Sequence, residues 1–153
     1  MAEVRDFIRW KVGMKLGIPL IDEQHANLLR IIDNLQLTCD KSADNNGQRF
    51  IGAANEAIGY VKYHFATEEK LMRLLEYPEY AGHREDHKDF LRELMSLCRE
   101  FKSEENPDFQ YFVDFLNEWV VSHVCDADRN FVDYFYNMQH HSKLKVLAVG
   151  ALA

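Results

Sequence analysis

Four long stretches of this chain carry apolar residues at alternating spacings of three and four, a pattern typical of helices that bury one face. Each stretch has roughly 18 to 28 residues, which is much longer than a typical strand. Polar residues, glycine or proline interrupt the pattern at 40–47 (DKSADNNG), at Tyr77-Pro78 and at 103–108 (SEENPD). Short connections of this kind favour antiparallel neighbours. We therefore predict an all-α, up-down-up-down four-helix bundle with helices at about 22–39, 48–75, 81–102 and 107–138.

The two ends of the chain lie outside this pattern. We expect an extended N-terminal arm over 1–20, a short C-terminal tail over 139–153 and a single domain over 1–153, because 153 residues suit one hydrophobic core. Asn106 is expected to cap the last helix, with Pro107 at its first position. The tail residues 144–153 (LKVLAVGALA) are apolar but too few to span a bilayer, so they would fray, pack on the bundle or dock a partner protein.

Charge and cysteine content exclude several classes of function. The net charge is -7 and no dense run of lysine or arginine is present, so nucleic acid and anionic membranes are not expected partners. Cys39, Cys98 and Cys125 are odd in number and far apart, which indicates free thiols in a reducing compartment. The first 20 residues include the charged side chains Glu3, Arg5, Asp6, Arg9 and Lys11 and therefore lack the apolar core of a signal peptide. These features predict a cytoplasmic protein with no transmembrane segment.

Several positions on the predicted buried faces hold histidine or a carboxylate in place of an aliphatic residue. They are His25 in the first helix, His64 and Glu68 in the second, His83 and His87 in the third, and His123 in the fourth. A buried imidazole or carboxylate without a partner costs several kcal/mol, so a group of them requires compensation inside the bundle. A single pair of this kind can arise by chance on an exposed face. A histidine on the inner face of all four helices favours a metal centre.

The spacing within each helix indicates which side chains share a face. His64 and Glu68 are four residues apart, and so are His83 and His87, which places each pair on one side of a helix. In the fourth helix the apolar pattern resumes at Asp128, five residues after His123, and residues five apart in a regular α-helix point about 140° away from each other. A one-residue π-bulge would bring the two side chains together. We predict such a turn and choose Asp128 as the carboxylate, although Asp126 would suit an unbroken helix.

In this order, the seven residues resemble the ligand set of the hemerythrins, specifically the bacterial single-domain form. The resemblance covers about residues 8–131. It includes the neighbouring motifs Trp10, Gly17-Ile18, Ile21-Asp22-Glu23-Gln24-His25, His64-Phe65, Glu68-Glu69 and Tyr77-Pro78, together with Trp119 four residues before His123.

The resemblance implies two iron ions with an oxo or hydroxo bridge. By analogy with the family, His83, His87 and His123 would bind one iron, and His25 and His64 the other. Glu68 and Asp128 would bridge both ions, and molecular oxygen would bind at an open position on one of them.

Three functions are compatible with such a site. The first is reversible binding of molecular oxygen for storage or delivery, which we favour because a histidine-rich donor set disfavours the high-valent iron of oxygenases. The second is oxygen or redox sensing through a partner protein, and the third is an enzyme that reduces peroxide or nitric oxide. Zinc is the alternative metal, but five histidines and two carboxylates exceed the needs of one tetrahedral site.

Other side chains are expected to support the ligands. Asp22, Glu23, Asp86 and backbone carbonyls are candidate acceptors for the second N–H of the ligand histidines, although Asp22 would serve equally as the N-cap of the first helix. Phe65, Trp119, Val120 and Val124 would form an apolar wall that excludes water, as part of the core. Cys125 is expected to be a small core residue, and His140 and His141 are expected to be solvated.

Overall fold

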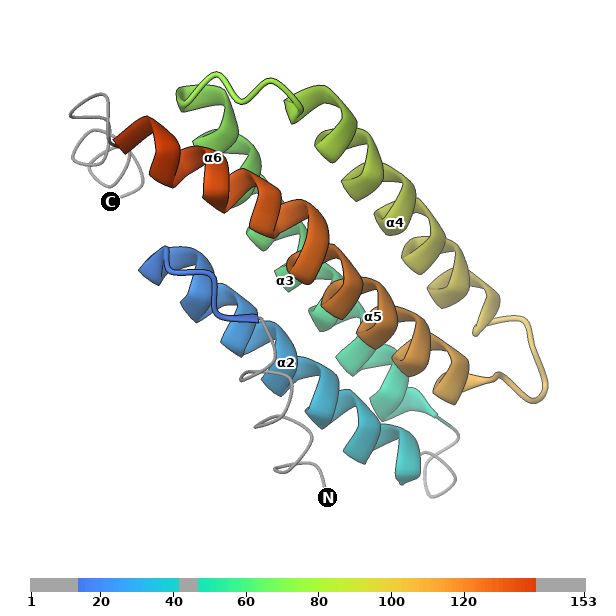
Figure 1. Cartoon of the computed structure of the whole chain (residues 1–153). Helices are drawn as coiled ribbons and strands as arrows, with labels where there is room; N and C mark the ends of the chain where they lie inside the picture. The colour runs from blue at the N-terminus through green and yellow to red at the C-terminus, as the bar shows by residue number, and fades with distance from the viewer. Residues whose placement is uncertain (1–13, 42–46, 140–153) are drawn as a thin grey trace.

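The chain forms four long helices, shown in Figure 1. The structure, a computed structural model, describes residues 14–41 and 47–139. Within them α2 spans Pro19–Asp40, α3 Gln48–Leu74, α4 Tyr80–Glu100 and α5 Phe109–His123. A π-helical turn, η3 (Val124–Asp128), continues α5 directly into α6 (Arg129–Gln139), so that α5, η3 and α6 form one long helix with an irregular middle.

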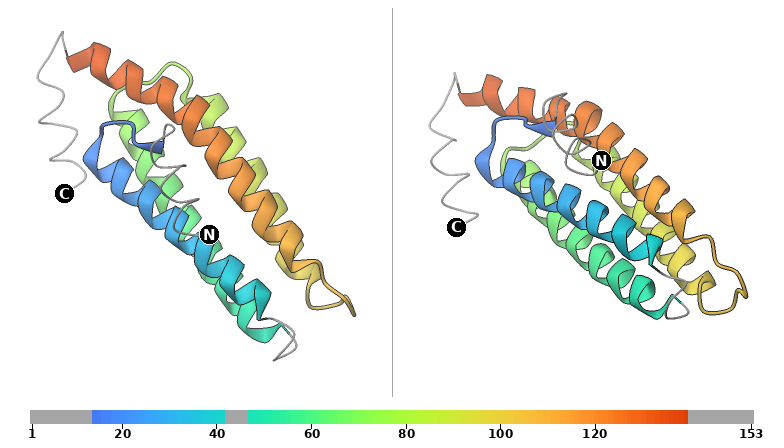
Figure 2. Two further views of the ribbon diagram at one scale, coloured as in Figure 1. Left: turned by 60° about the horizontal axis from the view of Figure 1, so that its bottom comes forward. Right: turned by 90° about the horizontal axis from the view of Figure 1, so that it is seen from below.

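The helices form the predicted bundle, with each helix running opposite to the one before it (Figures 1 and 2). α2 packs against α3 and α5, and α4 packs against α3 and α5, which closes the arrangement around one core. The all-α up-down-up-down prediction is thereby confirmed. No helix in the described part of the chain is long and apolar enough to cross a membrane.

Apolar residues spaced three and four apart fill most of the core. Leu28, Ile32 and Leu35 of α2 are at most 3% exposed, as expected for one face of a helix. At the end of the bundle where α2 finishes and α3 begins, Phe50 of α3 stacks on Phe109 of α5, with ring centroids 4.4 Å apart. The predicted polar positions lie toward the opposite end of the bundle. Apolar packing and the polar side chains therefore occupy different parts of the core.

Two helix starts differ from the prediction. α2 begins at Pro19 after the N-cap Ile18, so Asp22 lies inside the helix; its carboxylate accepts hydrogen bonds from the backbone N–H groups of Leu16 and Gly17, at 2.7 and 2.9 Å. At α5, the predictions that Asn106 is the N-cap and that Pro107 is the first helical residue are wrong, because the helix begins at Phe109. Asp108 caps this helix by accepting a hydrogen bond from the Tyr111 N–H at 3.0 Å.

Residues 14–18, the dark blue segment that precedes α2 in Figure 2, contact α6. Gly17 has a φ of 110°, a conformation that side-chain-bearing residues rarely adopt. The Tyr136 hydroxyl of α6 donates a hydrogen bond to the Gly17 carbonyl. Met14 is fully buried, so this end of the predicted arm is part of the packed structure.

The rest of the predicted arm (1–13), His140, His141 and the C-terminal tail, including 144–153, lie outside the described residues.

Candidate metal centre

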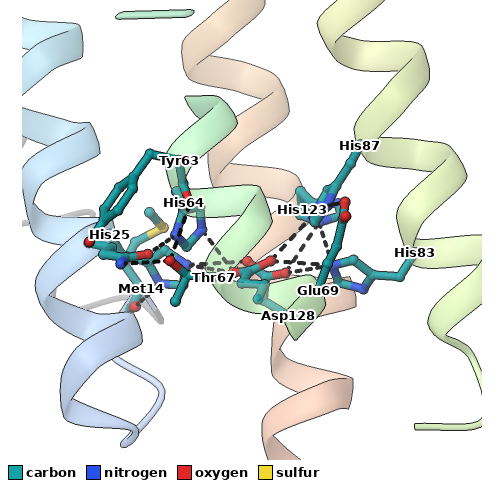
Figure 3. A network of polar contacts seen from close by, with 12 residues as sticks. Met14, His25, Tyr63, His64, Thr67, Glu69, His83, His87, His123 and Asp128 are labelled. Atoms are coloured by element: carbon teal, nitrogen blue, oxygen red, sulfur yellow. Dashed lines mark hydrogen bonds and ion pairs between the residues drawn. The ribbon is translucent and has the colours of Figure 1, made fainter. Parts of the chain in front are cut away.

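All seven side chains predicted to bind metal come together inside the bundle (Figure 3). Each is at most 9% exposed, and His25 and Glu68 are fully buried. Their donor atoms form two groups, and within each group all donor atoms lie within 4.8 Å of one another. The first group contains Glu68, His83, His87, His123 and Asp128, and the second contains His25, His64, Glu68 and Asp128. We call them the three-histidine and the two-histidine groups.

The two carboxylates belong to both groups, and each offers one oxygen to each group. Glu68 Oε1 lies 2.8 Å from His64 Nε2, whereas Glu68 Oε2 lies 3.4 Å from both His83 Nε2 and His87 Nε2. Asp128 Oδ2 lies 3.2 Å from His25 Nε2, whereas Asp128 Oδ1 lies 3.1 Å from His83 Nε2. Both carboxylates therefore have the arrangement needed to bridge two ions held by the two groups.

Protein hydrogen bonds alone do not satisfy this cluster. His123 Nε2 lies 3.0 Å from both His87 Nε2 and His83 Nε2, but one ring nitrogen can donate only one proton. Glu68 Oε2 and both oxygens of Asp128 are buried and accept no well-aligned hydrogen bond from any described residue. Two nitrogens bonded at right angles to one ion at about 2.1 Å would be about 3.0 Å apart. The spacing and the unmet donors and acceptors therefore fit two cations.

Electrostatics within the cluster favour charged side chains. Burial by itself would lower the pKa of His25, but the negative charges of Asp128 and Glu68, whose oxygens lie 3.2 and 3.4 Å from His25 Nε2, raise it to about 10. The same opposing causes raise the pKa of His83 to about 9. Burial would raise the pKa values of Glu68 and Asp128, yet the neighbouring imidazoles keep both well below the usual range. Without metal, protons on two imidazoles thus offset the two carboxylates, and a metal ion would have to displace these protons.

The π-helical turn at 124–128 places Asp128 beside His123, as the five-residue spacing predicts. Asp128 Oδ1 lies 3.2 Å from His123 Nε2, and the aspartate is 1% exposed. Asp126, the rival carboxylate, is exposed and lines a surface cavity next to His123. Cys125 is half-buried and lies outside both donor groups.

Three of the candidate ligand histidines turn their second ring nitrogen toward a fixed acceptor. His64 Nδ1 lies 2.7 Å from Gln24 Oε1, His87 Nδ1 lies 3.0 Å from Glu69 Oε1, and His25 Nδ1 lies 3.3 Å from the Met14 carbonyl oxygen. The backbone carbonyl was among the predicted acceptors, whereas Gln24 and Glu69 were not. Each histidine therefore has a partner that keeps its Nε2 facing the cluster.

Three other predicted acceptors do not take this role within the described structure. Asp22 binds the backbone of residues 16 and 17, and Glu23 and Asp86 are exposed. Gln24 and Glu69 directly adjoin the candidate ligands His25 and Glu68 in sequence, but only the packing of α2 on α3 and of α3 on α4 shows which histidine each one reaches.

Aromatic rings cover the three-histidine group. Phe65 stacks on His87 with centroids 3.6 Å apart and planes 2° from parallel, and Trp119 stacks on His123 at 4.2 Å. Phe65 is 4% exposed, and Val120 and Val124 are each 2% exposed. Phe65, Val120 and Val124 belong to the core, as predicted, and Trp119 is partly buried and packs against it. The stacked rings of Phe65 and Trp119 also restrict the orientation of two candidate ligand imidazoles.

A model of the hemerythrin HHE cation-binding domain matches residues 16–135, which include all seven side chains. The chain belongs to the hemerythrin family. Among curated relatives, it is 25% identical over 126 residues to a bacteriohemerythrin of Clostridium acetobutylicum, covering 81% of this chain and 98% of the relative. It is 29% identical over 125 residues to a bacteriohemerythrin of Aquifex aeolicus, covering 79% and 92%.

A crystal structure of a hemerythrin carrying a single leucine-to-alanine substitution has the same fold. Its TM-score is 0.69 at 24% identity, and the match covers 78% of this chain and 88% of the solved one. Hemerythrins bind oxygen and non-heme iron and are in general not enzymes, so this chain belongs to a family of oxygen-binding iron proteins.

Proposed function

We propose that this hemerythrin holds two iron ions and binds molecular oxygen reversibly for storage or delivery. The residues proposed to hold the ions are His25, His64, Glu68, His83, His87, His123 and Asp128. The observation that carries the proposal is the division of these donors into two groups that share both carboxylates.

The donor set suits iron. Imidazole is a good ligand for ferrous iron, and five imidazoles with two shared carboxylates would leave a single tetrahedral zinc ion with unused ligands. The three-histidine group offers five donor residues and the two-histidine group four. The position at His25 and His64 therefore has one donor fewer and more room for an external ligand. Two ferrous ions, one in each donor group, would supply the two electrons that oxygen takes up on binding and returns on release.

The protein contributes charge balance and exclusion of water. The carboxylates of Glu68 and Asp128 offset half of the four positive charges of two divalent ions, within a site whose side chains are at most 9% exposed. Phe65 and Trp119 hold the rings of His87 and His123 by stacking, and the buried ring of Phe65 keeps water from His87. With few anionic donors, the site is suited to binding oxygen and less to forming the high-valent iron that oxidises substrates.

The test is a cycle of reduction and oxygenation. The protein is loaded with iron, its iron content is measured, and it is reduced without air and then exposed to oxygen and to vacuum in turn. We expect two irons per chain and visible spectra that alternate through repeated cycles. Immediate and irreversible conversion to the diferric form would contradict a carrier and favour sensing through a partner protein, or reduction of peroxide or nitric oxide.

A further inference from the structure

The two donor groups differ in the charge of the residues that contact their histidines from outside. In the three-histidine group, His87 Nδ1 lies 3.0 Å from a carboxylate oxygen of Glu69. In the two-histidine group, His64 Nδ1 meets the amide oxygen of Gln24 and His25 Nδ1 meets the carbonyl of Met14. These two acceptors are neutral. The centre therefore has a negatively charged outer partner at His87, whereas the contacts that His25 and His64 make with described residues through Nδ1 are to neutral groups.

A chain of hydrogen bonds fixes the neutral side. The Thr67 hydroxyl donates to the Tyr63 carbonyl at 3.2 Å, so its oxygen is free to accept from the Gln24 amide NH₂, also at 3.2 Å. Gln24 then turns its amide oxygen toward His64, which must carry a proton on Nδ1. The lone pair of His64 Nε2 is left for the centre. Gln24 sets the orientation and tautomer of His64 without adding charge.

Glu69 makes the equivalent contact with Nδ1 of His87, but through a carboxylate that carries a negative charge. An ionised carboxylate only accepts hydrogen bonds, so His87 also carries its proton on Nδ1 and faces the centre with Nε2. The Glu69 side chain is 19% exposed, which leaves its charge only partly screened by water. Arg84 Nε lies 3.9 Å from the other Glu69 oxygen, but the Arg84 side chain is 46% exposed. The arginine therefore weakens the negative charge without cancelling it.

We infer that Glu69 is a positioning residue for the metal position at His83, His87 and His123, and that its negative charge makes this position favour the more highly charged of the two ions. The neutral Gln24 amide and Met14 carbonyl give no such preference to the position at His25 and His64. A carboxylate hydrogen-bonded to a ligand imidazole makes the imidazole a stronger donor, and losing such a partner typically costs 10- to 100-fold in metal affinity. The inference rests on the proposed di-iron function and extends it to an inequality between the two ions.

The experiment compares Glu69→Gln, Arg84→Gln and the double variant with the parent. The iron-loaded proteins are titrated spectroelectrochemically through the two one-electron steps between the diferric and diferrous forms. Metal-free samples are titrated with Co²⁺, whose visible bands report each binding event. Glu85→Gln is the matched control, because Glu85 lies on the same helix as His87, is paired with Lys88 at the surface and undergoes the same change of charge.

Removal of the Glu69 charge should raise the potential of one of the two steps by about 60 mV or more, the equivalent of a tenfold change in a one-electron equilibrium. It should also weaken one of the two Co²⁺ binding events by about 10- to 100-fold. Arg84→Gln should shift the same step in the opposite direction by a smaller amount, and the double variant should resemble Glu69→Gln. A loss of packing alone would not produce these opposite signs.

The inference is overturned if Glu69→Gln shifts neither quantity more than Glu85→Gln does, if it shifts both steps equally, or if Arg84→Gln moves the potential in the same direction as Glu69→Gln. Each of these results can occur in a protein that loads two irons and cycles oxygen normally. A parent protein that fails to load two irons or to cycle would instead contradict the proposed function.

Discussion

Raising the pH should destabilise the metal-free protein, because protons on buried imidazoles balance Glu68 and Asp128. The pKa of His25 rises from 6.5 to about 10 on folding. A group whose pKa is raised on folding stabilises the folded state fully below its unfolded value, and this stabilisation is lost as the pH rises through the folded value. The window is therefore pH 6.5 to 10. At 1.36 kcal/mol per pKa unit, the loss attributable to fully buried His25 is on the order of 5 kcal/mol.

This loss is large compared with the whole stability of a typical domain, which is about 5–15 kcal/mol. Since the same carboxylates also hold His83 protonated, the contribution of His83 is not independent and is not added. The assay is urea unfolding of the chelator-treated protein, followed by circular dichroism at several pH values from about 6 to 10. With a denaturant slope of about 1–3 kcal/mol/M, the midpoint should fall by roughly 2 to 5 M.

Two comparisons separate this effect from a general alkaline destabilisation. The variant His25→Asn should show a flatter profile over the same range. The metal-loaded protein should lose little stability or gain some, because bound cations replace the protons and bind more tightly as the imidazoles deprotonate. A metal-free profile that is flat or rises between pH 6.5 and 10 would refute the reasoning.

Three further predictions concern the candidate ligands and their support. Asp128→Asn should reduce bound metal from two ions per chain to one or none, because the Asp128 oxygens face both donor groups. The exposed Asp126 is the control, since Asp126→Asn should keep two ions, and metal analysis of the two purified variants distinguishes these outcomes. Deleting Cys125 should convert the π-helical turn into regular helix and retain metal binding. Inserting one alanine after Cys125 should instead turn α6 by about 100° and abolish metal binding. Retention of metal by the insertion variant would show that the register across the turn is unimportant. Phe65→Ala should lower the free energy of unfolding by about 3–5 kcal/mol and accelerate autoxidation, because it removes the ring stacked on His87; unchanged decay of the oxygenated spectrum would disprove the second effect.

The helices and the inward direction of the seven polar side chains could be predicted because both depend on spacing along one chain. Leu28, Ile32 and Leu35 repeat with the period of a helix and are buried as expected. The π-helical turn also leaves a trace in the sequence, since one extra residue separates His123 from the point where the buried pattern resumes at Asp128. The spacing of residues along each helix is therefore enough to predict the bundle and the side chains that point into it.

The outer contacts could not be predicted in the same way, because they depend on how helices rotate against one another. Gln24 lies on α2 and reaches His64 on α3, while Glu69 lies on α3 and reaches His87 on α4. Nothing in either sequence neighbourhood identifies the partner helix. The start of α5 illustrates a different limit: two residues with good capping side chains flank Pro107, and the second, Asp108, is the one whose carboxylate meets a free backbone N–H.

The contact between His25 and the Met14 carbonyl links the cluster to the edge of the fold. Met14 is held in place by the hydrogen bonds that Leu16 and Gly17 donate to Asp22, so transient opening of this segment deprives His25 of its outer acceptor. The exchange of the Leu16 and Gly17 amide hydrogens with solvent deuterium therefore measures the same opening that frees a buried imidazole to rotate. Retention of an ion at His25 and protection of these two backbone amides, which lie earlier in the chain, are expected to rise and fall together.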